Sequence, residues 1–198
     1  MVLAGFFRFW AGYSLGFLTA SFFEHRWPEH STQYSFAGAF IIVGGGLPAS
    51  VLGGFLSDKL ESKVPSMKGL IAGVGALAAT PFIFVAYIIQ PSFWGSICSY
   101  YMAYFIGEMW YGPSHAQINN MFPSEYQGFA VAVFNMFGST AGALGTLILS
   151  WMRQKYDGQK DDPPASDIDQ ARVDGLLLGW TVIACYLIAG PLFIISGI

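Results

Sequence analysis

The segment from Val43 to Lys63, VGGGLPASVLGGFLSDKLESK, places the tightest constraint on the fold. It contains no charged residue before Asp58, and its small residues recur four positions apart. Residues four apart lie on one face of a helix. Two small-residue seams follow: Gly46, Ser50 and Gly54, and Gly45, Ala49 and Gly53. In hydrocarbon no hydrophobic force drives helices together, and this spacing lets backbones approach closely. We therefore expect a membrane helix that leaves the bilayer near Asp58.

A similar seam lies 92 residues downstream, at Gly138 and Gly142. That offset aligns Gly46 with Gly138, and an offset of 91 aligns Tyr13 with Tyr104. Weak symmetry of this kind is typical of transporters built from internal repeats. It predicts two triplets of helices in which these glycines pack against other helices. The shared composition of Gly-rich and Ala-rich membrane helices is the alternative explanation.

The composition is that of a chain surrounded by lipid. Of the 198 residues, 54% are hydrophobic and 11% are charged, and the mean hydropathy is +0.50. A soluble domain carries about a quarter charged residues. The net charge of −3 gives no basic patch, so we expect no nucleic-acid partner. Cys98 and Cys185 fall within apolar stretches and predict no disulfide framework.

Six stretches approach the roughly 20 apolar residues that a helix needs to cross a bilayer. They cover about 2–23, 34–56, 69–89, 93–112, 126–152 and 175–198. We therefore predict an all-α membrane protein, with residues 1–198 forming a single bundle of six transmembrane helices. Residues 153–174 contain six Asp and the pair Pro163-Pro164, which predicts a solvated polar loop. Pro113 is expected to break or kink the fourth span.

Basic residues do not fix the orientation of the chain. With the termini in the cytoplasm, the inner loops would hold Lys59, Lys63 and Lys68, and the outer loops Arg26, Arg153, Lys155, Lys160 and Arg172. The positive-inside rule does not support that orientation. We expect an integral membrane protein that crosses the bilayer several times, in either the plasma membrane or an organelle membrane.

The end of the second span carries a recognisable pattern: Gly54, then Asp58, Lys59 and Lys63. On this pattern the chain resembles the carboxyl-terminal six-helix half of a major facilitator superfamily transporter, of the spinster-like branch. The chain departs from the family at Glu61, where Gly is usual. A second feature of the family, at the entry to the fifth span, has Gln127 where many members have Arg.

The resemblance implies a 3+3 inverted repeat and a cavity bordered by the first, second, fourth and fifth helices. It also implies a second six-helix half, in the same chain, in a second copy of this chain or in another subunit, and a small-molecule solute. Ser124 and Gln127 have the spacing of a capping box, which explains the entry to the fifth span without any charge contact.

Glu108 is the one carboxylate well inside a span. Tyr100, Tyr104, Tyr111 and His115 share its predicted helix face, at spacings of three or four. Burying an ion in hydrocarbon is expensive, so an intramembrane acid suggests a functional site. Glu108 would serve a substrate or proton-coupling site, or else act as a structural acid that binds a Tyr or pairs with an Arg.

Three other residues are candidates for contact with a solute. Arg8 lies near the start of the first span, where we expect its side chain to snorkel to the interface, although it is also within reach of Glu108 or an anionic solute. Asn135 lies on the face that carries Gly138 and suits either solute binding or an interhelical hydrogen bond. Tyr13 is also explained by an aromatic belt at the membrane interface.

The charged end of the second span is a candidate conformational switch. Asp58 is expected to bind backbone amides of the next helix or a cation across the interface between halves, with Lys59, Lys63 and Gly54 completing the motif. A solvated loop acid is the alternative. His25 and His30 have a spacing that suits a metal pair poorly, so we expect no metal site.

These patterns favour membrane transport of a small solute by alternating access. The alternative is a transporter-derived structural subunit of a larger membrane complex, with no transport activity. The chain has no P-loop, nucleophile elbow or dinucleotide-binding turn, so we expect neither an enzyme nor a bound cofactor.

Overall fold

The chain is all-helical over the residues that the structure describes, 1–157 and 166–197 of this computed structural model. The α-helices are α1 (Val2–Arg26), α2 (Ser31–Phe40), α3 (Leu47–Glu61), α4 (Met67–Phe84), α5 (Phe93–Gly107), α6 (Tyr111–Met121), α7 (Ser124–Asp157) and α8 (Asp167–Ser196). Two 3₁₀ turns, η1 (Pro28–His30) and η4 (Glu108–Trp110), and two π-helical segments, η2 (Ile41–Gly46) and η3 (Val85–Ile89), join or extend them.

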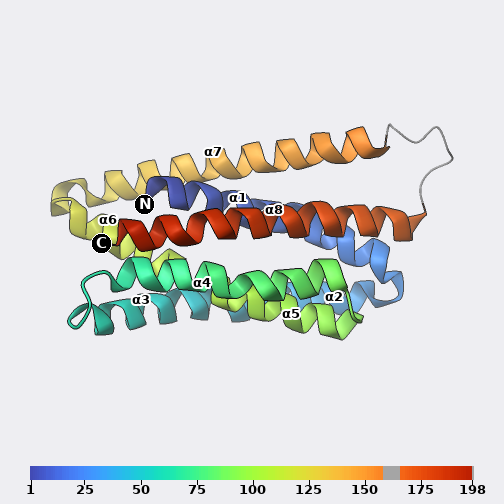
Figure 1. The fold of residues 1–198 in the computed structure, drawn as a ribbon, viewed down its shortest axis with the longest axis horizontal. Helices are drawn as coiled ribbons and strands as arrows, with labels where there is room; N and C mark the ends of the chain where they lie inside the picture. Colours follow the sequence, from blue (N-terminus) through green and yellow to red (C-terminus); the bar gives the residue numbers. More distant parts are fainter. Residues whose placement is uncertain (158–165, 198) are drawn as a thin grey trace.

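These elements form long helical segments that run along the longest axis of the molecule (Figure 1). η2 joins α2 to α3, η3 extends α4, and η4 joins α5 to α6. Both termini lie at one end of the bundle, together with the connection from α3 to α4 (Figure 1). α1 ends and α8 begins at the other end of the bundle (Figure 1).

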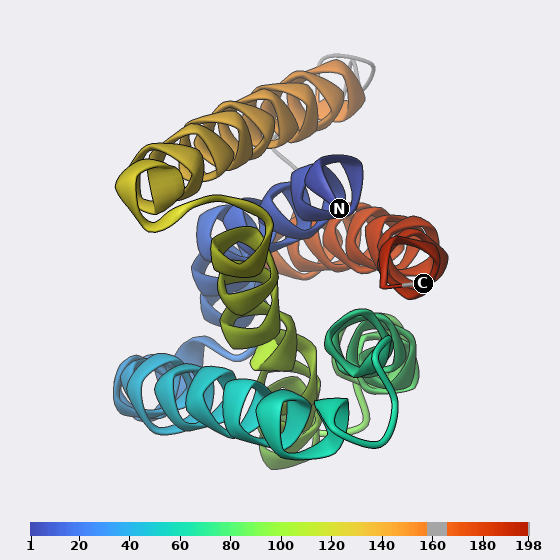
Figure 2. The same ribbon diagram turned by 90° about the vertical axis from the view of Figure 1, so that its left-hand side faces the viewer.

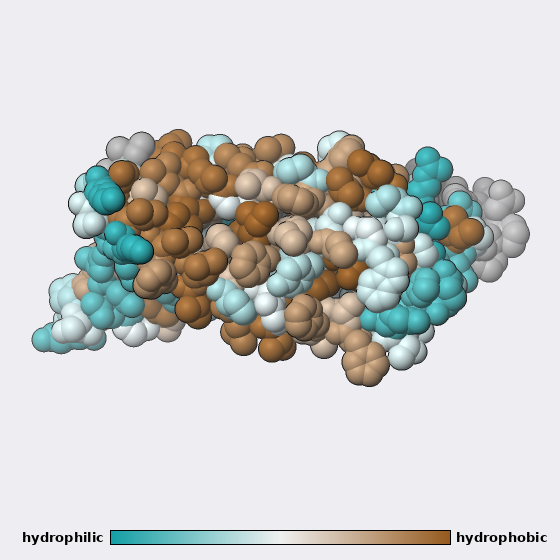
Figure 3. Space-filling view, turned by 90° about the horizontal axis from the view of Figure 1, so that it is seen from below, coloured by the Kyte–Doolittle hydropathy of each residue, from teal (hydrophilic) through white to brown (hydrophobic). Residues whose placement is uncertain are grey.

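Four segments are long and apolar enough to cross a membrane: Pro28–Glu61, Met67–Ile89, Ser124–Tyr156 and Asp167–Ser196. They are compatible with an integral, multi-pass membrane protein. On the face drawn in Figure 3, hydrophilic residues gather at the two ends of the long axis and most hydrophobic residues lie between them. The segments α1 and α5–η4–α6, which carry Arg8 and Glu108, are not among these four. Charged side chains within membrane helices almost always face the interior of the helix bundle.

α1 packs against α7 and α8, and α4 packs against α5 and α8. α6 contacts both α3 and α7, and Figure 2 shows those two helices on opposite sides of it. The larger hydrophobic core lies among α1, η3, α5 and α8, and includes the buried rings of Phe22, Phe23, Tyr87 and Tyr186.

The polar loop predicted over residues 153–174 is wrong at both ends. α7 continues to Asp157, and α8 begins at Asp167, after Ser166 accepts a hydrogen bond from the amide of Asp169. Acidic residues in a first helical turn are stabilised by the helix dipole, so the charges that suggested a loop fit the start of a helix. The Pro163-Pro164 part of the prediction lies outside the described residues.

The interruption of the fourth segment falls one turn before Pro113, at η4, and α6 runs through the proline. Proline has no N–H for the carbonyl four residues earlier, which belongs to Met109. That carbonyl oxygen lies where a Cβ on Gly53 of α3 would be, and a Cβ on Gly112 would meet the carbonyl oxygen of Ser50. α3 and α6 therefore make a backbone-to-backbone crossing.

The seam that begins at Gly46 and the downstream seam of Gly138 and Gly142 pack in different ways. Gly46 and Gly54 of the first seam lie beside Tyr104 and Gly112, and the backbone of Ser50 contacts Gly112. In α7, the positions that Cβ atoms would take on Gly138 and Gly142 are filled by the rings of Phe9 and Tyr13 from α1. The α7 seam accepts aromatic side chains, so it makes no close backbone approach there.

The predicted capping box is also absent at the start of α7, within the part of the chain described. Ser124 is the first residue of the helix. The side chain of Gln127 donates hydrogen bonds to the carbonyl oxygens of Asn119, at 2.9 Å, and Phe122, at 3.3 Å. Gln127 therefore ties the start of α7 to the end of α6.

Candidate functional site

A buried ion pair joins α1 to the interruption of the fourth helical segment. The Nη2 atom of Arg8 lies 3.3 Å from Oε1 of Glu108 and donates a hydrogen bond of 2.7 Å to the carbonyl oxygen of Gly107. The side chains of Arg8 and Glu108 are 1% and 20% exposed. Of the two predicted roles for Glu108, this geometry matches the acid paired with an arginine.

The expectation that Arg8 snorkels to the interface is wrong. Its guanidinium carbon lies 4.1 Å from the ring centroid of Tyr186 and 5.4 Å from that of Trp110. A carboxylate, a carbonyl and two aromatic faces together offset part of the cost of burying the cation. The same enclosure keeps Arg8 away from an anionic solute.

Gly107 makes room for this pair. A Cβ at residue 107 would lie 3.1 Å from the hydroxyl of Tyr186 and 3.6 Å from Nη2 of Arg8. The chain then enters η4, which begins at Glu108. The Nε and Nη1 atoms of Arg8 have no hydrogen-bond partner among the described residues. The pair is therefore only partly satisfied.

The other residues of the predicted stripe separate into two groups. Tyr100 is 5% exposed and packs against the rings of Tyr87 and Phe23, so it belongs to the core. Tyr104 is half-buried, and Tyr111 is 37% exposed. The structure therefore leaves Tyr104 and Tyr111, with Glu108 between them, as candidates for contact with a solute.

α6 and α7 bring two further candidates together. His115 stacks near Tyr111, with ring centroids 4.2 Å apart, and its Nδ1 atom lies 2.9 Å from the carbonyl oxygen of Tyr111. Its Nε2 atom is 3.5 Å from Nδ2 of Asn135. Tyr13 of α1 donates a hydrogen bond of 3.4 Å to the hydroxyl of Ser139. We call Tyr13, Tyr104, Tyr111, His115, Asn135 and Ser139 the polar face.

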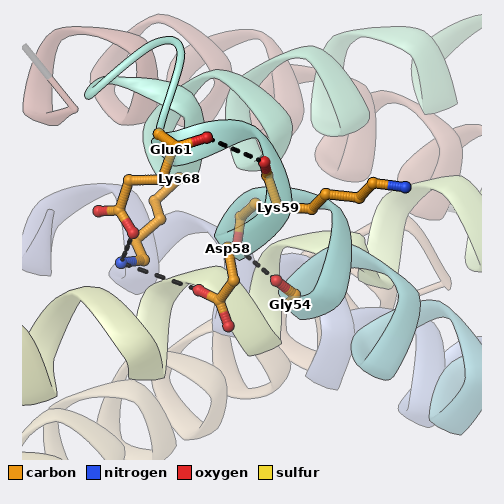
Figure 4. Close-up of polar contacts among 7 residues, drawn as sticks. Gly54, Asp58, Lys59, Glu61 and Lys68 are labelled. Carbon is orange, nitrogen blue, oxygen red and sulfur yellow. Dashed lines mark hydrogen bonds and ion pairs between the residues drawn. The ribbon is translucent and has the colours of Figure 1, made fainter.

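The charged end of α3 pairs with a lysine that the sequence analysis did not single out. Asp58 and Glu61 converge on Nζ of Lys68, at 3.9 and 2.6 Å, while Lys59 extends away from them (Figure 4). Lys68 is 5% exposed, whereas Lys63 lies at the surface. The carbonyl oxygen of Gly54 accepts a hydrogen bond from Ser57. Glu61, the departure from the family pattern, is thus the closer partner of Lys68.

A second polar cluster, which sequence reasoning placed in a loop, ties α7 to α1 and α8. Nε of Arg153 lies 3.0 Å from Oδ1 of the fully buried Asp174. Ser21 of α1 donates a hydrogen bond of 3.0 Å to Oδ2 of Asp174 and accepts one of 3.3 Å from Nη2 of Arg153. A charge next to the apolar run of α8 was the available signal, because a span that starts at residue 175 brings Asp174 close to the membrane.

The histidines near the end of α1 serve local contacts. His25 lies with Nδ1 2.8 Å from the carbonyl oxygen of Ser21, and His30 stacks on Phe93 with ring centroids 4.4 Å apart. No cluster of three or more His, Cys, Asp or Glu side chains occurs within residues 1–157 and 166–197.

Comparison of the chain with protein-family models, curated proteins and solved structures gives no match. The arrangement of side chains therefore stands alone as a guide to function. It combines a buried, partly satisfied ion pair with hydroxyl, amide and imidazole groups on the neighbouring helices.

Proposed function

We propose that the chain is half of an alternating-access transporter of the major facilitator type, moving a small solute across a membrane. In this proposal all six helical segments cross the bilayer, including α1 and α5–η4–α6. The two triplets, α1 to α4 and α5 to α8, form an inverted repeat.

The helix contacts support the repeat. α1, the first segment of one triplet, packs against α7 and α8, the second and third segments of the other. The α5–η4–α6 segment packs against α3 and α4 in the reciprocal way, and the third segments, α4 and α8, contact each other. Two interleaved and equivalent triplets have this pattern of contacts.

The observation that carries the transport proposal is the Arg8–Glu108 pair beside the polar face. Ionisable groups within membrane helices are costly and mark solute or ion pathways. Glu108 keeps one-fifth of its side chain exposed, and two guanidinium nitrogens of Arg8 have no hydrogen-bond partner among the described residues. An ion pair that lacks some of its hydrogen bonds can rearrange at a lower cost in free energy than a fully hydrogen-bonded pair.

The second half of the transporter would cover the faces of α2, α3 and α7. Large apolar side chains are exposed there, among them Phe36, Phe40, Leu47, Val51, Met136, Phe137 and Leu147. With a matching six-helix bundle against these faces, the polar face would line an enclosed cavity. Contiguous exposed apolar surface fits either such a bundle or lipid.

A structural subunit of a membrane complex is the second candidate. The Arg8–Glu108 pair favours it too, because an acid bound to an internal arginine can serve to fix two helices together. In that case Tyr13, His115 and Asn135 would hold helices together and would contact no solute.

The test is the solute content of sealed vesicles that contain the whole protein. Vesicles with the parent chain or with Glu108→Gln are incubated with a small-molecule extract, washed, and their contents compared by mass spectrometry. Transport predicts at least one solute enriched in parent vesicles and reduced with the variant. Identical contents in parent, variant and protein-free vesicles, together with co-purification of unrelated membrane subunits, would favour the structural role.

A further inference from the structure

We infer that the seam between α4–η3 and α8 binds an anionic phospholipid, with its phosphate held between Arg26 and Arg172. This inference rests on the membrane position of the chain and is independent of transport. The proposed phosphate site lies at the end of the bundle opposite the termini, where α1 ends and α8 begins (Figure 1).

Two arginines from opposite ends of the chain line one small cavity. Its volume is about 360 Å³, and Arg26, Gln90 and Arg172 line it together with Ile88, Ile168 and Leu176. Arg26 is held by Gln90, whose Oε1 accepts a 3.0 Å hydrogen bond from its Nε atom, and by the ring of Trp27 at 5.1 Å. No carboxylate of residues 1–157 or 166–197 forms an ion pair with either arginine.

The chemistry of this cavity suits a phosphate with apolar groups attached. Two guanidinium groups offer paired donors with the geometry that phosphate oxygens accept. Gln90 and three aliphatic side chains form the rest of the wall, and a hydrated inorganic anion would make no use of the aliphatic part. Basic pockets between membrane helices bind the head groups of acidic lipids.

An apolar groove follows the same seam toward the middle of the bundle. It has a volume of about 600 Å³ and is lined by Leu77, Thr80, Pro81, Phe84, Val85, Trp180, Ile183 and Leu187. Thr80 donates its hydroxyl to the carbonyl oxygen of Ala76, so it needs no partner in the groove. An acyl chain matches this apolar lining.

The cavity lined by the two arginines and the apolar groove lie along the same face of α8. Arg172, Leu176, Trp180, Ile183 and Leu187 are spaced four, four, three and four residues apart. The residues of α8 that line the groove run from Trp180 to Leu187, over which the helix rises about 10 Å at 1.5 Å per residue. One leaflet contributes about half of a hydrocarbon core roughly 30 Å thick, or about 15 Å. The groove therefore covers about two-thirds of the length of one acyl chain in one leaflet.

The test is lipid retention by the purified whole protein, measured by native mass spectrometry. The protein is equilibrated in micelles containing equal amounts of phosphatidylglycerol and phosphatidylcholine with the same acyl chains. We expect preferential retention of phosphatidylglycerol by the parent. Each basic side chain at a membrane surface favours anionic lipid by about fivefold, so Arg172→Gln should lower the preference about fivefold and Arg26→Gln/Arg172→Gln roughly 30-fold.

Two controls separate the parts of the proposal. Lys63→Gln removes an exposed positive charge in the connection from α3 to α4, which lies at the other end of the bundle (Figure 1), and should leave the preference unchanged. Leu187→Trp should reduce retention of both lipids by filling the groove, whereas Leu147→Trp, at an exposed position on α7, should not.

Equal retention of the two lipids by the parent would overturn the inference, as would an unchanged preference in the double variant. Glycerol 3-phosphate and inorganic phosphate supply the remaining comparison. If either displaces phosphatidylglycerol at equal concentration, the cavity is a site for soluble anions and the lipid assignment fails. Arg172 is exposed and makes no hydrogen bond within the described residues, so its replacement leaves the fold intact.

Discussion

Gly53 of α3 lies directly against the carbonyl oxygen of Met109, the oxygen that Pro113 leaves without an α-helical donor. The proline therefore weakens the helix at the level where α3 crosses it. The same contact brings α3 against the turn that begins at Glu108. A small residue at position 53 and a proline at position 113 therefore both act at Met109, the residue that follows Glu108.

Replacing Gly53 by alanine should destabilise the protein, because the added methyl group would overlap the backbone at Met109, which cannot move aside as a side chain can. Overpacking of this kind costs about 1–3 kcal/mol. The matched control is Gly16→Ala, since nothing lies within 4 Å of a Cβ at that position. Thermal unfolding of the purified protein in detergent measures both variants. Equal midpoints for the two would contradict the crossing.

The Arg8–Glu108 pair predicts an asymmetry between its two partners. Glu108→Gln leaves a cation whose side chain is 1% exposed, whereas Arg8→Met leaves a carboxylate that is 20% exposed and can be hydrated. Breaking a buried pair costs about 3–5 kcal/mol, and we expect Glu108→Gln to approach that range and Arg8→Met to fall below it.

The double variant Arg8→Met/Glu108→Gln completes the cycle. Its loss in free energy of unfolding should be smaller than the sum of the two single losses, because it leaves no unpaired charge. Chemical denaturation of the four proteins under one set of conditions gives the coupling free energy. A coupling near zero would mean that the two groups do not interact.

The two distances to Lys68 predict which acidic residue at the end of α3 contributes more to stability. Glu61 lies 2.6 Å from Nζ of Lys68 and Asp58 lies 3.9 Å away, with side chains 37% and 65% exposed. Exposed ion pairs contribute about 0.2–1 kcal/mol, so Glu61→Gln should lower stability more than Asp58→Asn, within that range. Lys59→Gln is the control, because Lys59 points away from the cluster (Figure 4). A larger loss with Asp58→Asn would show that the motif acts through other contacts.

Replacing Asp174 should loosen the structure around it without loosening the whole protein. Asp174→Asn removes the carboxylate that Arg153 and Ser21 bind, at a cost of about 1.5–3 kcal/mol for hydrogen bonds to a charged group. Faster hydrogen exchange is expected near the end of α7, around residues 149–156, and little change is expected near Glu108. Lys155→Gln, which leaves the cluster intact, should exchange as the parent does. Unchanged protection in Asp174→Asn would refute the tie between α7 and α8.

Apolar stretches were a sound guide to where helices lie and a poor guide to where they end. Hydropathy falls at Arg153 and rises again at Gly175, so the intervening charges suggested a loop. Backbone hydrogen bonding and capping by Ser166 extend both helices into that region. Helix length depends on these local terms, whereas the apolar run marks only the part that contacts lipid or core.

Pairing between distant charges was the harder part of the site to predict. The stripe through Glu108 and His115 follows from helical spacing alone, which depends on one helix. The partner of Glu108 lies 100 residues away, and the usual snorkelling of arginine near a helix end argued against it. Lys68 and Asp174 were missed for the same reason, since each gains its role from a second helix that spacing cannot specify.

The polar face is part of the functional proposal, and Ser139 offers a test position on it, exposed on α7 and in contact with Tyr13. With Cys98 and Cys185 replaced by Ala, Ser139→Cys is treated with a membrane-impermeant maleimide from each side of sealed membranes in turn. Alternating access predicts labelling from both sides, reduced from one side when Asp58→Asn, in the predicted conformational switch, shifts the balance of states. Labelling from neither side, or from one side regardless of every variant, would contradict the transport account.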